Sequence, residues 1–497
     1  MSSAKPSRWQ ARATLAVALI SGALFPLGFA PLAWRPLAFV ALAGLVWSAR
    51  QSGAAAGFLR GWLWGLGAFG VGVSWVYNSM HDFGGATPLA AASFTTLFVV
   101  YLALFPGLVV VLWRGCFAAS ACVYQQAVFL GAAWAALEWL RGWLMTGFPW
   151  LPTGSVLLDT PFEGLLPMLG GLGAGAVAVA VLVLVVLGTG RQRLLGLALV
   201  LIVWPLQWVE WGEPAGDPVE VALIQGNIPQ ELKMQRRHLN VSLQAYRKLS
   251  QPYWRSADIV VWPETAVPTY DNQVGGFWRY IERDMAHGQA ALLTGVFQRA
   301  ENGRDYYNAM LEVGGQGQVY RKHQLVPFGE YMPLRWAMEV FSAFVDIPMS
   351  DMASGPLQRA PMVLSGVPVG VSICYEMVYP DVMRAVLPNA QLLVNASNDA
   401  WFGDSFAPHQ HLEMARLRAR EFARPIARAT NTGITAAIDA KGRVNAVLTS
   451  FKADSQLVDI QPWRGSTPFT FIGQWWLGVA LTLGLIIGMV WRKRHVE

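Results

Sequence analysis

Three residues with side chains suited to nucleophilic chemistry each come directly after a run with the pattern of a β-strand. They are Glu264, Lys322 and Cys374, in this order, about 50 to 60 residues apart. Sheets that alternate with helices place functional groups at the carboxyl ends of their strands. A thiol at a strand-to-turn elbow is exposed beside free backbone N–H groups, as a nucleophile requires. The set is therefore a candidate for cysteine-based catalysis.

Each of the three residues also fits a structural role when it is considered alone. Glu264 could be a turn residue that faces solvent, and Lys322 could be a solvated surface lysine. Cys374 could be a buried and inert thiol, because no second cysteine lies in its part of the chain. Only their order and their shared position after strands favour chemistry.

Histidine is the usual base of cysteine catalysis, but none of the seven histidines has a compelling sequence context. His323 adjoins Lys322 without a clear role. His409 and His411 are two residues apart and would face different ways on a helix, so they do not predict a metal site. Glu264 is thus favoured as the base, and neither a metal nor another cofactor is expected.

Two more polar loops follow predicted strands. Glu330 ends the segment Pro327-Phe328-Gly329-Glu330, and a polar and aromatic loop runs from Asn395 to Gly403. Both loops share the position after a strand that Glu264, Lys322 and Cys374 also have.

The elements that position these loops alternate between strand-like and helix-like patterns, which predicts an α/β layered domain with both sheet faces covered. The predicted helices are 235–249, 276–286 and 409–423. The predicted strands are 219–224, 259–262, 291–297, 310–313, 319–320, 367–373, 391–394, 434–438 and 444–448.

The rest of the chain has a different composition. The whole sequence of 497 residues is 54% hydrophobic and 14% charged, whereas a soluble domain is nearer 25% charged. Residues 217–468 hold about 48 of the 68 charges. These figures exclude a disordered chain, a disulfide-stapled mini-protein and a purely cytosolic globule. They indicate one globular domain, at 217–465, inserted into a membrane protein.

Apolar runs predict eight membrane helices, seven within 1–211 and the eighth at 469–491, although the short second run, 36–49, could instead be a re-entrant or tilted piece. The runs are 13–30, 36–49, 57–77, 89–113, 124–145, 165–188, 194–211 and 469–491. Glu138 and Arg141 lie near the end of the fifth run, where an ion pair is the simplest interpretation.

Basic residues predict the orientation of these helices. With a cytoplasmic N-terminus, about eleven Lys and Arg residues fall on the inside, and only Arg35 and Arg141 fall on the outside. This distribution follows the positive-inside rule. Both termini would be cytoplasmic and the 217–465 domain would lie outside the cytoplasm. The net charge of +6 is then mostly an orientation signal, so no nucleic-acid partner is expected.

Five motifs in a fixed order carry a resemblance to a known family. They are Gln225-Gly226-Asn227-Ile228-Pro229, Trp262-Pro263-Glu264-Thr265-Ala266, the segment from Lys322 to Glu330, Cys374-Tyr375-Glu376 and the segment from Ser397 to Gly403. Together they resemble the nitrilase, or carbon–nitrogen hydrolase, superfamily. With the eight predicted membrane helices, the whole chain resembles its membrane branch, the apolipoprotein N-acyltransferases. One departure is His323-Gln324 before Leu325, where the family would place histidine directly before that leucine.

The resemblance implies an eight-helix transmembrane bundle that carries an αββα sandwich in the bacterial inner membrane, with the sandwich in the periplasm. It implies acyl transfer from a phospholipid to the α-amine of a diacylglyceryl-cysteine lipoprotein through a thioester, in the last step of lipoprotein maturation. Cys374 would be the nucleophile, Glu264 the base and Lys322 the cation that stabilises the oxyanion. The supporting residues would be Glu330, Tyr375, Glu376 and Asn398. A monomer is expected.

Three other classes of protein remain open from the residues alone. A membrane-tethered amidase would use the same three chemical residues. A non-catalytic ligand-binding domain would not need all three together, and eight helices exceed what an anchor requires. A transporter would concentrate its polar residues near the middle of the bilayer.

Overall fold

The computed structural model describes the chain except residues 1–7, 119–120, 287, 333–351 and 497. The chain forms two compact units, which we describe separately. The helical unit comprises Met1–Tyr77, Ala91–Val209 and Phe471–Glu497, and the sheet unit comprises Asn78–Ala90 and Glu210–Thr470.

Every predicted membrane run coincides with a helix. These helices are α1 (Arg8–Leu24), α2 (Arg35–Ala49), α3 (Ala54–Gly72), α5 (Pro88–Cys116), α6 (Val123–Arg141), α7 (Leu166–Leu187), α8 (Arg191–Val203) and α16 (Gln474–Val496). By length and composition, three described segments could cross a membrane, namely Trp9–Gly28, Pro88–Cys116 and Glu163–Leu187. Two shorter apolar helices are Arg35–Ala49 and Gln474–Val490. The protein therefore carries candidate membrane spans, and the count of eight stays a prediction.

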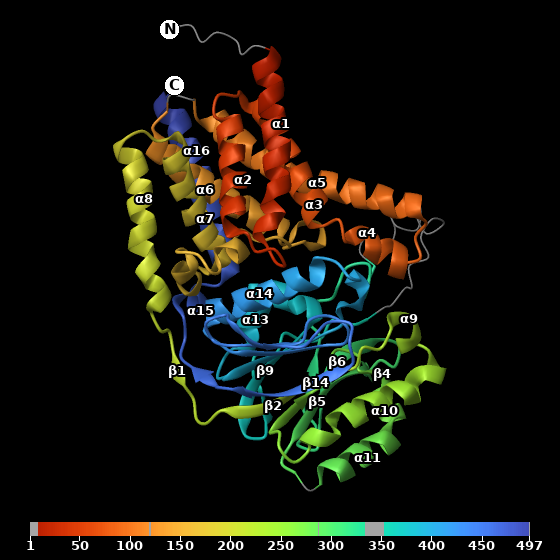
Figure 1. Cartoon of the computed structure of the whole chain (residues 1–497). Helices are drawn as coiled ribbons and strands as arrows, with labels where there is room; N and C mark the ends of the chain where they lie inside the picture. The colour runs from red at the N-terminus through yellow and green to blue at the C-terminus, as the bar shows by residue number, and fades with distance from the viewer. Residues whose placement is uncertain (1–7, 119–120, 287, 333–351, 497) are drawn as a thin grey trace. The chain divides into compact units, whose positions relative to one another are not determined.

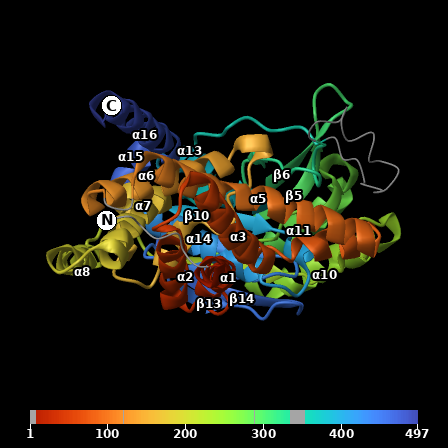
Figure 2. The same cartoon turned by 90° about the horizontal axis from the view of Figure 1, so that it is seen from above.

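Small residues allow the helices of the helical unit to pack closely. A Cβ at Gly65 would lie 2.6 Å from the Cα of Ala103, so α3 and α5 could not keep their present distance with a larger residue there. The helix α8 lies at the edge of this unit in both views (Figures 1 and 2) and packs mainly on α7.

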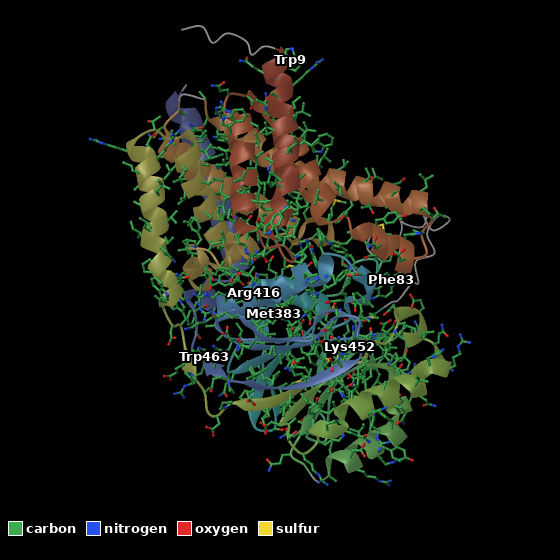
Figure 3. All side chains as sticks on the ribbon, viewed as in Figure 1. Trp9, Phe83, Met383, Arg416, Lys452 and Trp463 are labelled. Carbon is green, nitrogen blue, oxygen red and sulfur yellow. The ribbon has the colours of Figure 1, made fainter. Side chains whose placement is uncertain are left out.

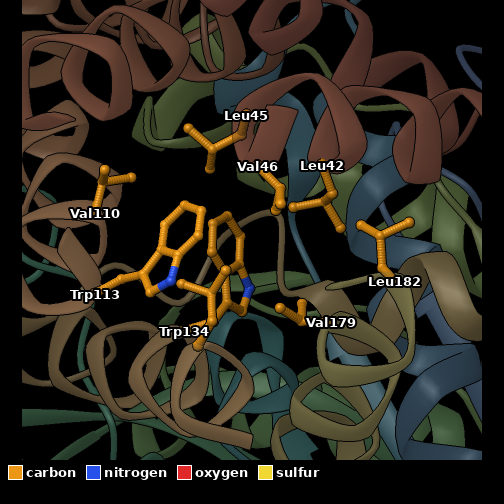
Figure 4. Close-up of a pocket in the computed structure, with 9 residues that line it drawn as sticks. Leu42, Leu45, Val46, Val110, Trp113, Trp134, Val179 and Leu182 are labelled. Carbon is orange, nitrogen blue, oxygen red and sulfur yellow. The ribbon is translucent and has the colours of Figure 1, made fainter. Parts of the chain in front are cut away.

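An apolar pocket lies among α2, α5, α6 and α7 (Figure 4). Its lining has no charged side chain and includes the indoles of Trp113 and Trp134. The polar edge of each indole is satisfied within the unit, because Trp113 donates to Gln126 Oε1 and Trp134 donates to Thr153 Oγ1. The pocket is part of the apolar interior of the helical unit.

Glu138 and Arg141 at the end of α6 both hold the segment that follows it. Glu138 accepts hydrogen bonds from the backbone N–H and the hydroxyl of Thr153, at 3.1 and 2.6 Å. Arg141 donates to the carbonyl oxygens of Phe148 and Trp150. The pair therefore fixes a chain reversal, which goes beyond the simple ion pair that the sequence suggested.

Two sheets form the core of the sheet unit. The first has the order β14 (Asp454–Ile460), β2 (Val219–Gln225), β3 (Ile259–Val261), β5 (Ala291–Arg299), β6 (Tyr306–Val313) and β7 (Val319–Arg321), with β4 (Val267–Tyr270) beside β5. The second has the order β13 (Val444–Val447), β12 (Ala436–Ile438), β11 (Ile426–Thr430), β10 (Leu392–Ser397), β9 (Val367–Ile373) and β8 (Met362–Leu364). A short pair joins β1 (Glu213–Pro214) to β15 (Trp463–Arg464). Within each main sheet the central strands are parallel.

Helices cover both outer faces of the two sheets, which gives a layered α/β architecture. The helices α10 (Leu239–Ser250) and α11 (Gly275–Met285) lie on one side, and α13 (Pro380–Val386) and α14 (Ala407–Phe422) lie on the other (Figure 1). Strand β3 is covered on both faces, and all three of its residues are buried. This burial explains its continuous apolar sequence.

The predicted strands and helices of this unit are confirmed, with ends that shift by a few residues. The sequence patterns missed β4, β8, β11, β14 and α13. They also missed the contribution of Asn78–Ala90, which precedes most of α5. In that segment Ser79 donates to the carbonyl oxygen of Trp401 at 2.7 Å, and Phe83 (labelled in Figure 3) packs edge-on against the Trp401 indole.

Candidate active site

Glu264 lies in a turn that directly follows β3 and approaches the neighbouring strand β5 very closely. A Cβ at Gly295 of β5 would lie 2.3 Å from the backbone nitrogen of Thr265 and 2.5 Å from the carbonyl oxygen of Pro263. Thr265 adopts a positive φ of 50°, which is uncommon for a residue other than glycine. The turn thus needs a glycine opposite it, and it directs the Glu264 carboxylate into the interior.

The Glu264 carboxylate is held by three donors. Its Oε1 accepts from Asn308 Nδ2 at 2.7 Å and from Lys322 Nζ at 3.1 Å. Its Oε2 accepts from the backbone N–H of Asn398 at 2.8 Å. The carboxylate is therefore fixed in position although it is buried.

Lys322, one residue after β7, lies between two carboxylates. Its ammonium group is 3.1 Å from Glu264 Oε1 and 2.9 Å from Glu330 Oε1, and the side chain is only 1% exposed. Burial lowers the pKa of Lys322, but the negative charges of Glu264 and Glu330 outweigh burial and hold this pKa well above its ordinary value. Lys322 is therefore a permanent cation in the site.

Glu330 supports this arrangement from the loop after β7. Its Oε2 accepts from the backbone N–H of Val326 at 2.8 Å, within the same loop. Its Oε1 accepts from Lys322 and, at 3.0 Å, from Asn308. The amide of Asn308 thus bridges the two carboxylates, and the sequence analysis did not identify this residue.

Cys374 lies at a sharp elbow between β9 and a short 3-10 helix. Its φ is 51°, in the left-handed region, and its side chain is buried. Burial raises the pKa of the thiol, the Glu264 carboxylate raises it further and Lys322 lowers it. The side chain of Ser397 also lowers this pKa. Cys374 therefore rests as a thiol and needs a base to become a nucleophile.

Glu376 joins the elbow to the segment that carries Lys322. It accepts hydrogen bonds from the backbone N–H groups of Ile373 at 2.7 Å, His323 at 2.7 Å and Gln324 at 3.1 Å, and from the Tyr320 hydroxyl at 2.8 Å. Burial raises its pKa, and these donors oppose that shift. Glu376 therefore holds the two segments together, and His323 takes part through its backbone N–H group.

The loop after β10 connects the site to the first sheet. The side-chain amide of Asn398 donates through Nδ2 to Gln230 Oε1 at 2.8 Å, and its side-chain oxygen Oδ1 accepts from Asn431 Nδ2 at 3.2 Å. Tyr375, next to Cys374, is buried and packs edge-on against Tyr379. The structure thus brings Asn398 to Glu264, and it places Tyr375 at the elbow.

A fully buried polar network, absent from the sequence predictions, lies behind Cys374. His411 Nε2 lies 3.2 Å from the carbonyl oxygen of Cys374, and His411 Nδ1 lies 3.0 Å from both Asp399 Oδ1 and Arg428 Nη2. Arg428 also pairs with Asp399 at 2.7 Å. Although burial alone would raise it, the pKa of Asp399 is lowered by Arg428 and His411. The two-residue spacing of His409 and His411 had suggested no role for either residue.

A second buried lysine, Lys233, also lies at this site. It ends the short helix α9 (Gln230–Lys233), and its Nζ donates to the main-chain carbonyl oxygen of Glu264 at 3.0 Å. Its sequence signal was weak, because a lysine shortly after a proline looks like a solvated helix residue.

Within the described residues, no group of three or more His, Cys, Asp or Glu side chains is arranged to hold a metal ion.

Comparisons with known proteins match both units of the chain. Residues 21–184 match the family model of the apolipoprotein N-acyltransferase N-terminal domain, and residues 220–465 match the carbon-nitrogen hydrolase model. The chain is 40% identical over 490 residues to the apolipoprotein N-acyltransferase of Methylococcus capsulatus, and the match covers 96% of each chain. It is 40% identical over 473 residues to that of Pseudomonas paraeruginosa, with 92% of each covered. A solved structure of a carbon–nitrogen hydrolase superfamily protein from Xanthomonas campestris matches 49% of this chain and 91% of its own, at 18% identity and a TM-score of 0.37.

Proposed function

The chain belongs to the apolipoprotein N-acyltransferase family, and we propose that it transfers an acyl chain from a phospholipid to the N-terminal amine of a diacylglyceryl-cysteine lipoprotein. The family match extends over the helical unit, at residues 21–184. This extent favours an acyltransferase over a tethered amidase, which would need only the hydrolase domain. It also disfavours a non-catalytic binding domain and a transporter.

In the first half of the proposed reaction, Cys374 takes the acyl chain. Glu264 accepts the proton of the thiol, and the sulfur attacks the ester carbonyl of the phospholipid. The tetrahedral oxyanion collapses to a thioester on Cys374. The departing lysophospholipid oxygen takes the proton back from Glu264, so the carboxylate is restored.

In the second half, the lipoprotein amine resolves the thioester. Glu264 accepts a proton from the amine as its nitrogen attacks the thioester carbon. The carbon–sulfur bond then breaks, an amide forms, and the sulfur regains a proton from Glu264. The free thiol and the ionised carboxylate are both regenerated, which completes a ping-pong cycle.

Lys322 is proposed to stabilise the oxyanion in both halves, together with a backbone N–H near Tyr375. The observation that carries the whole proposal is the position of Lys322 between Glu264 and Glu330, at 3.1 and 2.9 Å, because these carboxylates keep it charged in a buried site. The same contacts hold Glu264 beside the ammonium group of Lys322, which would stabilise the oxyanion. Glu330, Glu376 and Asn398 would position these groups.

The proposed setting is the bacterial inner membrane, which the chain would cross eight times. Both termini would be cytoplasmic, the sheet unit would lie in the periplasm, and the protein would act as a monomer without a cofactor. The candidate spans and the distribution of basic residues support this orientation. In this setting both lipid substrates reach the protein from the bilayer, and apolar helices can keep water away from the thioester.

The test is intact-mass and peptide mass spectrometry of the full-length protein. After incubation with phospholipid alone, the Cys374 peptide should gain the mass of one acyl chain. Adding a diacylglyceryl-cysteine peptide should then remove that mass and produce a triacylated peptide. Turnover without any adduct on Cys374 would contradict the thioester route, and loss of the adduct to water without acylated peptide would indicate an amidase or esterase.

A further inference from the structure

Lys233 is a buried lysine that the proposed reaction leaves unused. Only 1% of its surface is exposed, although lysines are almost never fully buried unless they are paired. In the described part of the chain, its ammonium group makes one hydrogen bond, to the main-chain carbonyl oxygen of Glu264 at 3.0 Å. That carbonyl is neutral, so this bond does not supply a counter-charge.

The counter-charge for Lys233 comes from the candidate active site itself. Burial lowers the pKa of Lys233 to about 8, and the negative charge of Glu264, with that of Cys374 when it is a thiolate, opposes the shift. At neutral pH, Lys233 is therefore a buried cation whose ammonium group is held against the main chain of Glu264.

The formal charges around the thiol show why a second cation matters. Glu264 and Glu330 are two carboxylates that share one ammonium group, that of Lys322. With the thiol protonated, these three residues carry one net negative charge, and Lys233 offsets it. A buried site with an uncompensated negative charge would oppose the formation of a thiolate.

We propose that Lys233 is a second cation of the active site, whose ammonium group stabilises the negative charge as it passes from the Glu264 carboxylate to the sulfur of Cys374. In this step the S–H bond of Cys374 breaks and an O–H bond forms on Glu264, so the net charge of the site does not change. The ammonium group of Lys233 lies 3.0 Å from the main-chain carbonyl oxygen of Glu264, the residue that accepts the proton. Its hydrogen bond also holds the Glu264 turn, in which Thr265 has a positive φ. The catalytic consequence rests on the proposed function, whereas the effect on the thiol does not.

The first experiment measures the alkylation of Cys374 by iodoacetamide in the full-length protein, read on the Cys374 peptide by mass spectrometry. This readout needs no lipid substrate, and it separates Cys374 from Cys116 and Cys122. Three variants are compared with the wild type. Lys233→Gln keeps a hydrogen-bond donor and loses the charge, and Lys233→Arg keeps the charge. Lys248→Gln makes the same change at an exposed lysine of α10 and serves as the control.

At pH 7 we expect Lys233→Gln to slow the alkylation of Cys374 about tenfold, because a nearby opposite charge lowers a pKa by one unit or more. Lys233→Arg should retain most of the rate, and Lys248→Gln should match the wild type. Above pH 8 the difference between Lys233→Gln and the wild type should shrink, because wild-type Lys233 then loses its own charge. A purely structural lysine would give a difference that does not depend on pH.

The second experiment measures the thioester that phospholipid forms on Cys374 in the same proteins. Lys233→Gln should form the adduct about tenfold more slowly than wild type, in line with the alkylation rates. If alkylation responds as expected but wild type forms no adduct, the proposed function is wrong and the role of Lys233 toward the thiol stands. The proposal is overturned if Lys233→Gln is alkylated at the wild-type rate both at pH 7 and above pH 8 and unfolds at a temperature similar to that of wild type. If Lys233→Arg proves unfolded, the pH dependence of Lys233→Gln alone decides.

Discussion

The imidazole of His411 lies directly behind the nucleophile elbow, with Nε2 at 3.2 Å from the carbonyl oxygen of Cys374. A carbonyl oxygen only accepts hydrogen bonds, so Nε2 must be the donor. Burial and the charge of Arg428 lower the pKa of His411, against the effect of Asp399, and the other ring nitrogen, Nδ1, lies 3.0 Å from both Asp399 Oδ1 and Arg428 Nη2. His411 thus anchors the main chain of Cys374.

Removal of this anchor should slow acylation without a loss of substrate binding. We expect His411→Leu to reduce the rate of thioester formation on Cys374 by roughly tenfold to a hundredfold, because small misplacements of a reacting group have effects of that size. His411→Gln, which keeps an N–H donor, should recover part of the rate. His409→Leu, two residues away on the same helix, is the control and should leave the rate unchanged. Equal rates for His411→Leu and wild type would show that the main chain of Cys374 keeps its position without the hydrogen bond from His411.

Replacement of Asn308 by aspartate should be more damaging than loss of an ordinary hydrogen bond. The amide donates to Glu264 at 2.7 Å and to Glu330 at 3.0 Å, and an aspartate would place a third carboxylate beside one lysine. Asn308→Asp should therefore lose nearly all thioester formation at pH 7 and unfold at a lower temperature, while Asn240→Asp on the surface should do neither. An active Asn308→Asp protein would mean that the bridge is dispensable.

The close approach of Gly295 to the Glu264 turn predicts a specific sensitivity of this position. An added methyl group would meet backbone atoms at 2.3 and 2.5 Å, which must shift the turn. Gly295→Ala should lower the free energy of unfolding by about 1 to 3 kcal/mol and strongly reduce acylation. Gly276→Ala in α11, where nothing lies within 4 Å of the new Cβ, should be neutral or slightly stabilising. Thermal unfolding and adduct formation on both variants check this.

The two partners of the buried ion pair should differ in their effect on stability. Lys322→Met leaves Glu264 and Glu330 without their shared cation, and loss of one partner of a buried pair costs about 3 to 5 kcal/mol. Glu264→Gln leaves Lys322 paired with Glu330 and should cost less. Both variants should lose the acyl adduct. A Glu264→Gln protein that unfolds at a lower temperature than Lys322→Met would contradict this order.

The pH dependence of stability should carry a contribution from Lys233. Burial lowers its folded-state pKa from 10.5 to about 8, so between these values the unfolded chain binds more protons than the folded chain. The free energy of unfolding therefore gains a rising contribution as the pH increases through this window. Lys233→Met lacks that contribution, so the unfolding temperature of wild type should improve relative to the variant from pH 8 to pH 10. A constant difference would show that Lys233 titrates with its ordinary pKa.

Much of the architecture could be predicted because it depends on local patterns. A continuous apolar run identifies β3, an alternating pattern identifies β9, and long apolar stretches identify the helices of the helical unit, since burial imposes such patterns on each segment separately. The sequence pattern also predicted that Glu264, Lys322 and Cys374 each follow a strand. The resemblance added roles for these residues, which remain proposals.

The contacts within the site could not be predicted because the residues that make them are distant in the sequence. The backbone N–H of Asn398 reaches Glu264 across 134 residues, and Lys233 reaches the carbonyl of Glu264 across 31 residues. A single polar residue in an apolar strand, such as Asn308, or a histidine on a helix, such as His411, carries no signal of what it will contact.

The sequence by itself thus determined which segments are buried and which chemical groups stand at the strand ends, because hydrophobic periodicity and residue type are local properties. Only the tertiary structure decided which buried charges meet. It placed one ammonium group between two carboxylates, a second lysine behind the base and a histidine behind the nucleophile. The physical reason is that burying a charge is costly unless a partner lies within a few ångströms, and the packing of two sheets sets those distances.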